Sequence, residues 1–272
     1  MSVITVSRQF GSLGKEIAEK LAESLGYKFL DKEILESQYD KYGIPDVSFD
    51  KYDEKNPGFL EYFKSGKDRY LRYLKTVVFE NSKEGNCVIC GRGAHLMLHG
   101  IPGVLKVRVI ASMETRAGRV AEQLSCDLKN AERIISQYDK NRSGFHKFFF
   151  EQDWRDPDFY DVILNTDYLS VDSCVDTLLT MNKCECLQSD PEVLKNRIED
   201  KFIAQEVIIA LMYEHSIPID ILDVTSENGV VSIKGTVTVE QNIEQCVKAA
   251  MKVPGVKSVD PEIYFITNYM GY

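Results

Sequence analysis

The sequence lacks any long apolar run and any excess of positive charge. No stretch approaches the roughly 18–20 consecutive apolar residues that a membrane-spanning helix needs. The N-terminus, MSVITVSRQF, has no basic segment followed by an apolar one, so we expect no signal peptide. The 33 lysines and arginines are outnumbered by 42 aspartates and glutamates, which gives a formal net charge of -9. This balance argues against a sequence-independent nucleic-acid binder but permits a phosphate site made from a few local cations.

Cysteine and histidine are too scattered for the sites that they commonly build. The seven cysteines are an odd number without the spacing of a disulfide scaffold, which predicts reduced thiols and a cytoplasmic location. The four histidines, His95, His99, His146 and His215, show no metal-ligand spacing. The sequence therefore identifies neither a metal centre nor a nucleophile–base arrangement, and the ligands of any metal stay unassigned.

Short apolar strands alternate with helices over the first two thirds of the chain. Strands are expected at 2–6, 27–30, 87–90, 104–110 and 161–164, and helices at about 14–25, from 31, and at 60–80, 114–124, 128–139 and 171–180. The acidic segment 46–58 contains breakers and predicts an irregular excursion. Alternation of this kind predicts an α/β fold, with a mostly parallel sheet covered by helices on both faces.

A different pattern begins near Asp190. A long helix at 193–213 precedes strands at 219–224 and 230–237, which Asn228-Gly229 joins as a hairpin. A helix at 240–251 and a strand at 256–265 complete the order α-β-β-α-β. We therefore expect one domain at 1–182 and a small α+β domain at 192–268.

The segment SRQFGSLGKE, residues 7–16, joins the first strand to the first helix and has features of a phosphate-binding loop. Glycines allow the backbone to approach an anion, amides at a helix N-terminus point at it, and a lysine neutralises its charge. Gly14 and Lys15 fit the pattern GxxxxGK[ST], whereas Gln9 replaces the first glycine and Glu16 replaces the residue that usually touches Mg²⁺. An ordinary strand-to-helix turn is the alternative. The candidate phosphate-binding residues are Gly11, Ser12, Leu13, Gly14, Lys15 and Glu16.

Four stretches in order resemble the cytidylate-kinase-like family of P-loop nucleoside monophosphate kinases. They are SRQFGSLGKEIAEKLAESLGYKFLDKEIL, CVICGRGAHLML, VLKVRVIASMETRAGRV and AERIISQYDKNRSGFHKFFFEQDWRDPDFYDVILNT. The resemblance implies a P-loop kinase fold with a helical lid, ATP and Mg²⁺ as cofactors, and a small phosphorylatable acceptor, with CMP or dCMP as the default. A nucleotide sensor with an altered loop and a kinase of a non-nucleotide acceptor are the alternatives.

The resemblance also implies roles for single residues. Lys15 is expected on the β/γ-phosphates, and Arg92 on the acceptor phosphate unless it only forms a surface ion pair. Asp31 is expected near the acceptor or Mg²⁺, although it can also cap the following helix. We expect Lys15, Asp31 and Arg142 to be the catalytic residues.

A polar and aromatic segment between two expected helices resembles the lid that closes over phosphates in this family. Its candidate residues are Asp139, Arg142 and Lys147, with Arg142 expected to stabilise charge on the transferring group. A solvated loop is the alternative. Trp154, the only tryptophan, is expected to pack in the core or the lid rather than to stack on a base.

The run DILDVTSENGVVSIKGTVTVEQNIEQCVKAAMKVPGVKSV resembles a BON domain. The resemblance implies a non-catalytic module that binds small ligands, phospholipid surfaces or proteins. The run is not notably basic, so charge does not support binding to anionic lipid. We therefore expect a regulatory or oligomerising module that contacts a second copy or another protein.

Overall fold

The computed structural model describes residues 2–38, 64–184 and 190–266, so the expected excursion at 46–58 lies outside the described residues. The chain divides into two compact units. The first contains Met1–Leu71 and Glu84–Leu194, and the second contains Arg72–Lys83 and Lys195–Tyr272. The division does not follow sequence order, because one stretch of about three helical turns groups with the C-terminal part. No helix among the described residues is both long and apolar enough to cross a membrane.

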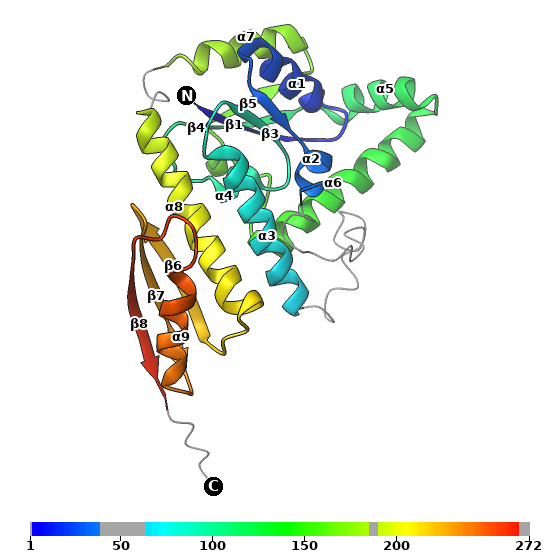
Figure 1. The fold of residues 1–272 in the computed structure, drawn as a ribbon. Helices are drawn as coiled ribbons and strands as arrows, with labels where there is room; N and C mark the ends of the chain where they lie inside the picture. Colours follow the sequence, from blue (N-terminus) through cyan, green and yellow to red (C-terminus); the bar gives the residue numbers. More distant parts are fainter. Residues whose placement is uncertain (1, 39–63, 185–189, 267–272) are drawn as a thin grey trace. The chain divides into compact units, whose positions relative to one another are not determined.

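The first unit is built on a five-stranded sheet (Figure 1). Its strands lie in the order β2 (Lys28–Leu30), β3 (Cys87–Cys90), β1 (Val3–Arg8), β4 (Val104–Ile110) and β5 (Val162–Asn165). Every neighbouring pair is parallel. Strands β1 and β3 are buried nearly throughout because their apolar residues face helices on both sides. The expected parallel α/β fold is confirmed.

Helices α1 (Gly14–Leu25) and α7 (Val171–Met181) lie side by side on one face of the sheet (Figure 1). Ile17 and Leu21 of α1 are fully buried and four residues apart, which is the spacing of one helix face. The helix ends at Gly26, whose amide bonds back to the last turn. The unit also contains α2 (Lys32–Glu36), part of α3 (Lys64–Ser82), α4 (Ala94–Met97), α5 (Met113–Leu124), α6 (Leu128–Phe150) and the short η4 (Pro157–Phe159).

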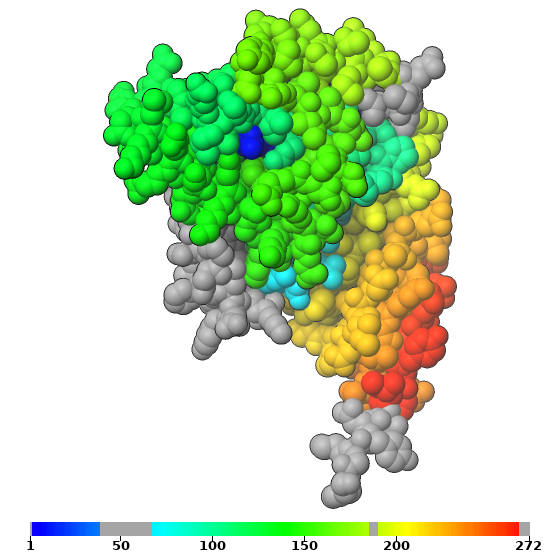
Figure 2. Space-filling model, turned by 180° about the vertical axis from the view of Figure 1, so that it is seen from behind, coloured from blue at the N-terminus to red at the C-terminus, as the bar shows by residue number. Residues whose placement is uncertain are grey.

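Helix α6 corrects one expectation. The helix expected at 128–139 runs on to Phe150, so the segment at 139–147 is helical and the solvated-loop alternative is wrong. Helices α5 and α6 share an apolar cluster of Ala117, Val120, Ala131 and Ile135. Figure 2 shows the first unit from a side where this central part of the chain, in green, forms most of the surface. The N-terminal part, in blue, reaches that surface only as a small enclosed area.

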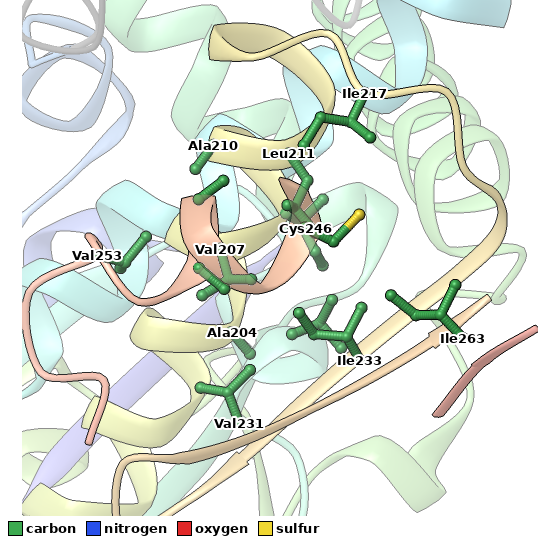
Figure 3. Packing of buried hydrophobic residues seen from close by; sticks show 14 of the residues in the cluster. Ala204, Val207, Ala210, Leu211, Ile217, Val231, Ile233, Cys246, Val253 and Ile263 are labelled. Carbon is green, nitrogen blue, oxygen red and sulfur yellow. The ribbon is translucent and has the colours of Figure 1, made fainter. Parts of the chain in front are cut away.

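The second unit has the expected order α-β-β-α-β. It contains α8 (Pro191–Ile209) with a π-helical end η6 (Ala210–Glu214), then β6 (Asp220–Glu227), β7 (Val230–Val237), α9 (Gln241–Ala250) and β8 (Ser258–Phe265). Strand β7 lies in the middle, antiparallel to β6 and parallel to β8. Side chains from both helices and the sheet meet in one core, which includes the fully buried Val207, Leu211 and Cys246 (Figure 3).

The β6–β7 turn is held by a carboxylate from α8. Asn228 and Gly229 both have left-handed backbone conformations, φ 52° and 81°, as the tight turn of a hairpin requires. Asp200, which is only 9% exposed, accepts bonds from the amides of Asn228 (2.9 Å) and Gly229 (3.1 Å) and from the Ser226 hydroxyl (2.8 Å). One side chain thus satisfies three donors and ties the hairpin to the helix.

Replacing this carboxylate should loosen the hairpin. In Asp200→Ala the turn amides lose their acceptor, and we expect the free energy of opening at residues 226–231 to fall by about 2–3 kcal/mol. Native-state hydrogen exchange on the full chain measures this directly. Asp223→Ala, which removes an exposed carboxylate from the same hairpin, is the matched control. Equal protection in the two variants would contradict the role of Asp200.

Candidate functional site

The candidate site lies where the carboxyl ends of β1, β2 and β3 meet. Val6 is opposite Cys90, and Leu30 is opposite Ile89, so these three strands end side by side. The loops that follow them contain the phosphate-loop segment, Asp31 and 91–93. Ligands of parallel sheets bind beyond this edge. Residues that are far apart in the sequence are therefore brought together as expected.

The phosphate loop is fastened to β4 and its continuation by its own polar side chains. The Gln9 side chain accepts the Ala111 amide (3.0 Å), and the Gln9 amide donates to Val109 (3.0 Å). The fully buried Ser12 hydroxyl lies 2.8 Å from the Gln9 carbonyl and 3.2 Å from that of Val109. The residue that replaces the first glycine thus holds the loop. The amide of Ser12 also donates to the Gln9 carbonyl (3.3 Å), so both the hydroxyl and the amide of Ser12 are used inside the loop.

The start of α1 offers backbone donors. Leu13 is the N-cap of the helix and has a left-handed conformation (φ 62°). Its side chain accepts no hydrogen bond from the amides of the first turn, so it does not compete with an anion for them. Glu16 is exposed on that turn. Arg92, in the facing loop, is also left-handed (φ 53°). A non-glycine residue in this region costs about 1–2 kcal/mol, and such strain concentrates at functional sites.

Lys15 and Asp31 form an ion pair at the mouth of the site. Lys15 Nζ lies 3.0 Å from Asp31 Oδ2, and the other carboxylate oxygen accepts the Ile34 amide at 3.1 Å. Asp31 therefore caps α2 and contacts Lys15 at the same time. Burial opposes ionisation of Asp31, but the Ile34 amide and the Lys15 ammonium together hold its pKa below the ordinary value. The hydrogen bond to Asp31 raises the pKa of Lys15.

Carboxylates for Mg²⁺ are few. Among the residues that the structure describes, no three His, Cys, Asp or Glu side chains group as metal ligands. Mg²⁺ in phosphoryl-transfer sites is commonly held by one or two carboxylates together with substrate phosphates and water. Asp31 beside the loop and Glu16 on the first turn of α1 are the carboxylates that suit this arrangement.

Arg92 is an interior residue. Its guanidinium pairs with Glu36 of α2, and its side chain is only 3% exposed. The guanidinium also lies over the Phe145 ring of α6, 5.4 Å from the centroid. Arg92 therefore forms an ion pair, but the pair is buried, so the expected alternative of a surface ion pair is wrong.

Helix α6 bonds directly to the backbone of the phosphate loop. Asp139 Oδ1 accepts the Phe10 amide (3.0 Å), and Oδ2 accepts Arg116 of α5 (2.6 Å). One turn later, Arg142, only 9% exposed, donates to the Arg8 carbonyl at 2.8 Å. Two of the expected lid residues therefore hold the loop in its present shape.

A cavity of about 490 Å³ opens beside the loop along α6. Lys147, the third expected lid residue, lines this cavity together with a second lysine of the same helix. Its lining residues are Gln9, Asp139, Lys140, Ser143, Gly144, Lys147, Trp154 and Arg155. The side chains of Lys140, Lys147 and Arg155 place positive charge in this cavity, next to the loop.

A buried polar network under the loop was not expected from the sequence. Arg108 of β4, 4% exposed, donates to the Trp154 carbonyl and the Tyr160 hydroxyl and stacks on the Trp154 ring. The Tyr160 hydroxyl also lies 3.2 Å from both Ser7 Oγ and His95 Nε2. In the sequence, the arginine inside the mostly apolar strand VLKVRVI is the feature that could have indicated this network. Trp154 packs in the interior, as expected.

His146 of α6 is a neutral histidine beside this network. Its Nδ1 lies 2.8 Å from the Arg142 carbonyl, to which it donates as a neutral ring, and its ring lies against that of His95 at 5.3 Å between centroids. Burial, aided by the positive charge of Arg108, Arg142 and Arg8, lowers the pKa of His146 to about 4. Burial also lowers the pKa of His95 well below its ordinary value.

Comparison with known proteins assigns relatives to both units. Residues 3–168 match the cytidylate kinase-like family, and residues 199–265 match the BON domain. A cytidylate kinase of Pyrobaculum aerophilum is 28% identical over 176 residues, covering 64% of this chain and 89% of that protein. A cytidylate kinase of Methanopyrus kandleri is 30% identical over 180 residues, covering 62% and 87%. The crystal structure of an uncharacterized protein from Eubacterium ventriosum superposes with a TM-score of 0.54 at 25% identity, covering 66% and 97%. Both resemblances noted in the sequence are confirmed.

Acid should destabilise the first unit through His146. The unfolded side chain has the ordinary pKa of 6.5 and the folded one a pKa of about 4, so the unfolded state binds the extra proton between these values. Stability is then full above pH 6.5 and falls by at most about 3 kcal/mol as pH falls to 4. Denaturant unfolding followed by Trp154 fluorescence reports on this unit. We expect a smaller pH dependence in His146→Phe but not in the exposed control His99→Gln, and an unchanged slope in His146→Phe would contradict the assignment.

Proposed function

The chain belongs to the cytidylate kinase-like family, and on this basis we propose that its first unit transfers a phosphoryl group from ATP to a nucleoside monophosphate, with CMP or dCMP the first acceptors to test. Membership of the family and the curated cytidylate kinase relatives support phosphotransferase chemistry. The cytidylate kinases among the relatives support CMP and dCMP as acceptors.

One observation carries the proposal. Lys15, at the start of α1, lies 3.0 Å from Asp31 at the end of a neighbouring strand. A cation for donor phosphates is thereby adjacent to a carboxylate that can face the acceptor. Phosphoryl transfer requires little covalent chemistry from the protein and depends on positioning and on charge stabilisation. A cation and a carboxylate at one edge of a parallel sheet supply both.

The donor side is formed by the phosphate loop. The backbone amides at the start of α1 and the Lys15 ammonium would bind the β- and γ-phosphates. ATP would supply the phosphoryl group. Asp31 or Glu16 would hold Mg²⁺ together with the phosphates, and the ion would supply positive charge against theirs. Because Gln9 and Asp139 fix the loop from two sides, its amides need little rearrangement before they meet an anion.

The acceptor side is formed by Asp31 and the 91–93 loop. Asp31 is ionised at neutral pH, because its pKa is held below the ordinary value, so it can accept a hydrogen bond from the acceptor or hold Mg²⁺. Arg92, fixed by Glu36, would order the loop that receives the acceptor. Arg142 would stabilise negative charge on the transferring group from its place beside the phosphate loop.

We propose a regulatory or oligomerising role for the second unit. Its sheet ends at the edge strand β8, where Tyr264 is 69% exposed and Phe265 is 45% exposed. An edge strand with exposed aromatic side chains is a surface on which another chain can pair. This observation favours a protein partner or a second copy.

A coupled ADP-release screen tests the function. Purified full-length chain is incubated with ATP, Mg²⁺ and each of CMP, dCMP, UMP, AMP, GMP and a panel of small hydroxylated metabolites. ADP release that depends on CMP or dCMP supports the proposal, and release only with a metabolite points to a non-nucleotide acceptor. ATP binding without turnover on any acceptor would instead favour a nucleotide sensor.

Lys15→Ala should reduce kcat/KM by about 10²–10³-fold, because a cation on the transferring charge is lost. The fold should be unaffected, since the Lys15 side chain is 47% exposed and Asp31 keeps its bond from Ile34. Lys20→Ala, which removes an exposed lysine paired with Asp172 from the same helix, is the matched control. Unchanged turnover in Lys15→Ala would refute a phosphate-binding loop.

Arg142→Ala should lower kcat by about 10²–10⁵-fold with little change in ATP affinity, if its charge meets the phosphoryl group chiefly in the transition state. Arg142→Lys should restore little, because an ammonium lacks the planar fork of guanidinium. Steady-state kinetics are compared with ATP titration, and Trp154 fluorescence shows whether each variant stays folded. Wild-type kcat in Arg142→Ala would restrict this side chain to holding the loop.

A further inference from the structure

Arg8 occupies the meeting point of the two glycine-containing loops of the site. It is the last residue of β1 and is partly buried. A Cβ built on Gly14 would overlap the Cβ of Arg8, and a Cβ built on Gly91 would overlap the guanidinium of Arg8. The side chain thus runs beneath the first residue of α1 and ends against the loop that follows β3.

This path explains why glycine stands on both sides of Arg8. Any side chain at position 14 would collide with the stem, and any side chain at position 91 would collide with the charged end. Gly91 also has a left-handed φ of 94°, which disfavours other residues. The two glycines therefore make room for a guanidinium at this place, between the phosphate loop and the 91–93 loop.

Arg8 differs from its neighbours in charge pairing. Lys15 pairs with Asp31, Arg92 with Glu36 and Arg116 with Asp139. The guanidinium of Arg8 makes no ion pair and no hydrogen bond with any residue that the structure describes.

The positive charge of Arg8 nevertheless acts on the buried His146. It contributes, after burial and other groups, to the lowered pKa of His146. Partial burial removes some of the hydration of a cation, and without a carboxylate no ion pair compensates for this loss. A bound anion would compensate for it.

We propose that Arg8 binds the phosphate group of the acceptor, on the side of the site formed by the ends of β1 and β3. A guanidinium presents two parallel N–H donors to phosphate oxygens, and such charge-assisted pairs are strong and geometrically specific. Arg92, the residue of the 91–93 loop expected for this role, already pairs with Glu36 of α2. The identity of the ligand as an acceptor phosphate rests on the proposed function. The existence of an anion site at Arg8 does not rest on it.

The test measures binding to the full-length chain rather than turnover. Wild type, Arg8→Ala, Arg8→Lys and the control Arg133→Ala are titrated calorimetrically with CMP, inorganic phosphate, cytidine and ATP. Arg133 is an exposed arginine of α6 whose side chain bonds only to Asn130 among the described residues. Trp154 fluorescence confirms that each variant is folded.

We expect Arg8→Ala to weaken CMP and inorganic phosphate by about 10–100-fold, as the loss of a charged hydrogen-bonding pair implies. Affinity for cytidine and ATP should be unchanged, Arg8→Lys should recover only part of the loss, and Arg133→Ala should match wild type. Equal CMP and phosphate affinities in wild type and Arg8→Ala, or no binding of either to wild type, would overturn the inference. An equal loss for ATP would move Arg8 to the donor side and overturn its acceptor assignment.

The two proposals fail in different ways. If no monophosphate is phosphorylated while inorganic phosphate still binds wild type more tightly than Arg8→Ala, the proposed function falls and the anion site stands. If CMP is phosphorylated and Arg8→Ala binds CMP as tightly as wild type does, the function stands and the role of Arg8 falls.

Discussion

The shape of the candidate site depends on the bridge made by the Asp139 carboxylate. One oxygen accepts the Phe10 amide, and the other accepts the Arg116 guanidinium, so the phosphate loop, α5 and α6 are joined at a single side chain. The Phe10 ring stacks on Tyr138, the residue before Asp139, with 4.2 Å between the ring centroids. A loop that presents backbone amides to an anion must be held open by groups outside itself, and this bridge is one of them.

Gln9 also supports the phosphate loop, because its side chain accepts a hydrogen bond from the Ala111 amide. Sequence comparison with the GxxxxGK[ST] pattern marks Gln9 as a departure, yet in the structure it does structural work that glycine could not do. Pattern mismatch and loss of function are thus different things. The loop keeps Gly14 and Lys15 from the pattern and changes the first glycine to Gln9, which supports the loop. Glu16 stands where the pattern has the residue that usually touches Mg²⁺.

Much of the fold could be predicted because its signals are local. Apolar runs such as CVIC followed by glycine predict buried parallel strands, and Asn228-Gly229 predicts the hairpin. The residues at strand ends could be predicted for the same reason, since topology brings those ends together. The continuation of α6 to Phe150 could not, because the segment contains Gly144 and is held by distant partners such as the Arg8 carbonyl. The contact between Arg8 and Gly91 could not be predicted either, since Gly91 is remote in the sequence and follows the neighbouring strand β3.

The discontinuous second unit has a consequence for biosynthesis. Arg72–Lys83 leaves the ribosome long before residues 195–272, with which it groups. During that interval this stretch, which includes the fully buried Leu74, Val77 and Val78, lacks the rest of the unit with which it groups. Nascent segments of this kind are prone to aggregation and are typical clients of chaperones. The order in which the polypeptide is made therefore differs from the order in which its parts can become stable, because the second unit cannot assemble until the stretch that begins at Lys195 has joined Arg72–Lys83.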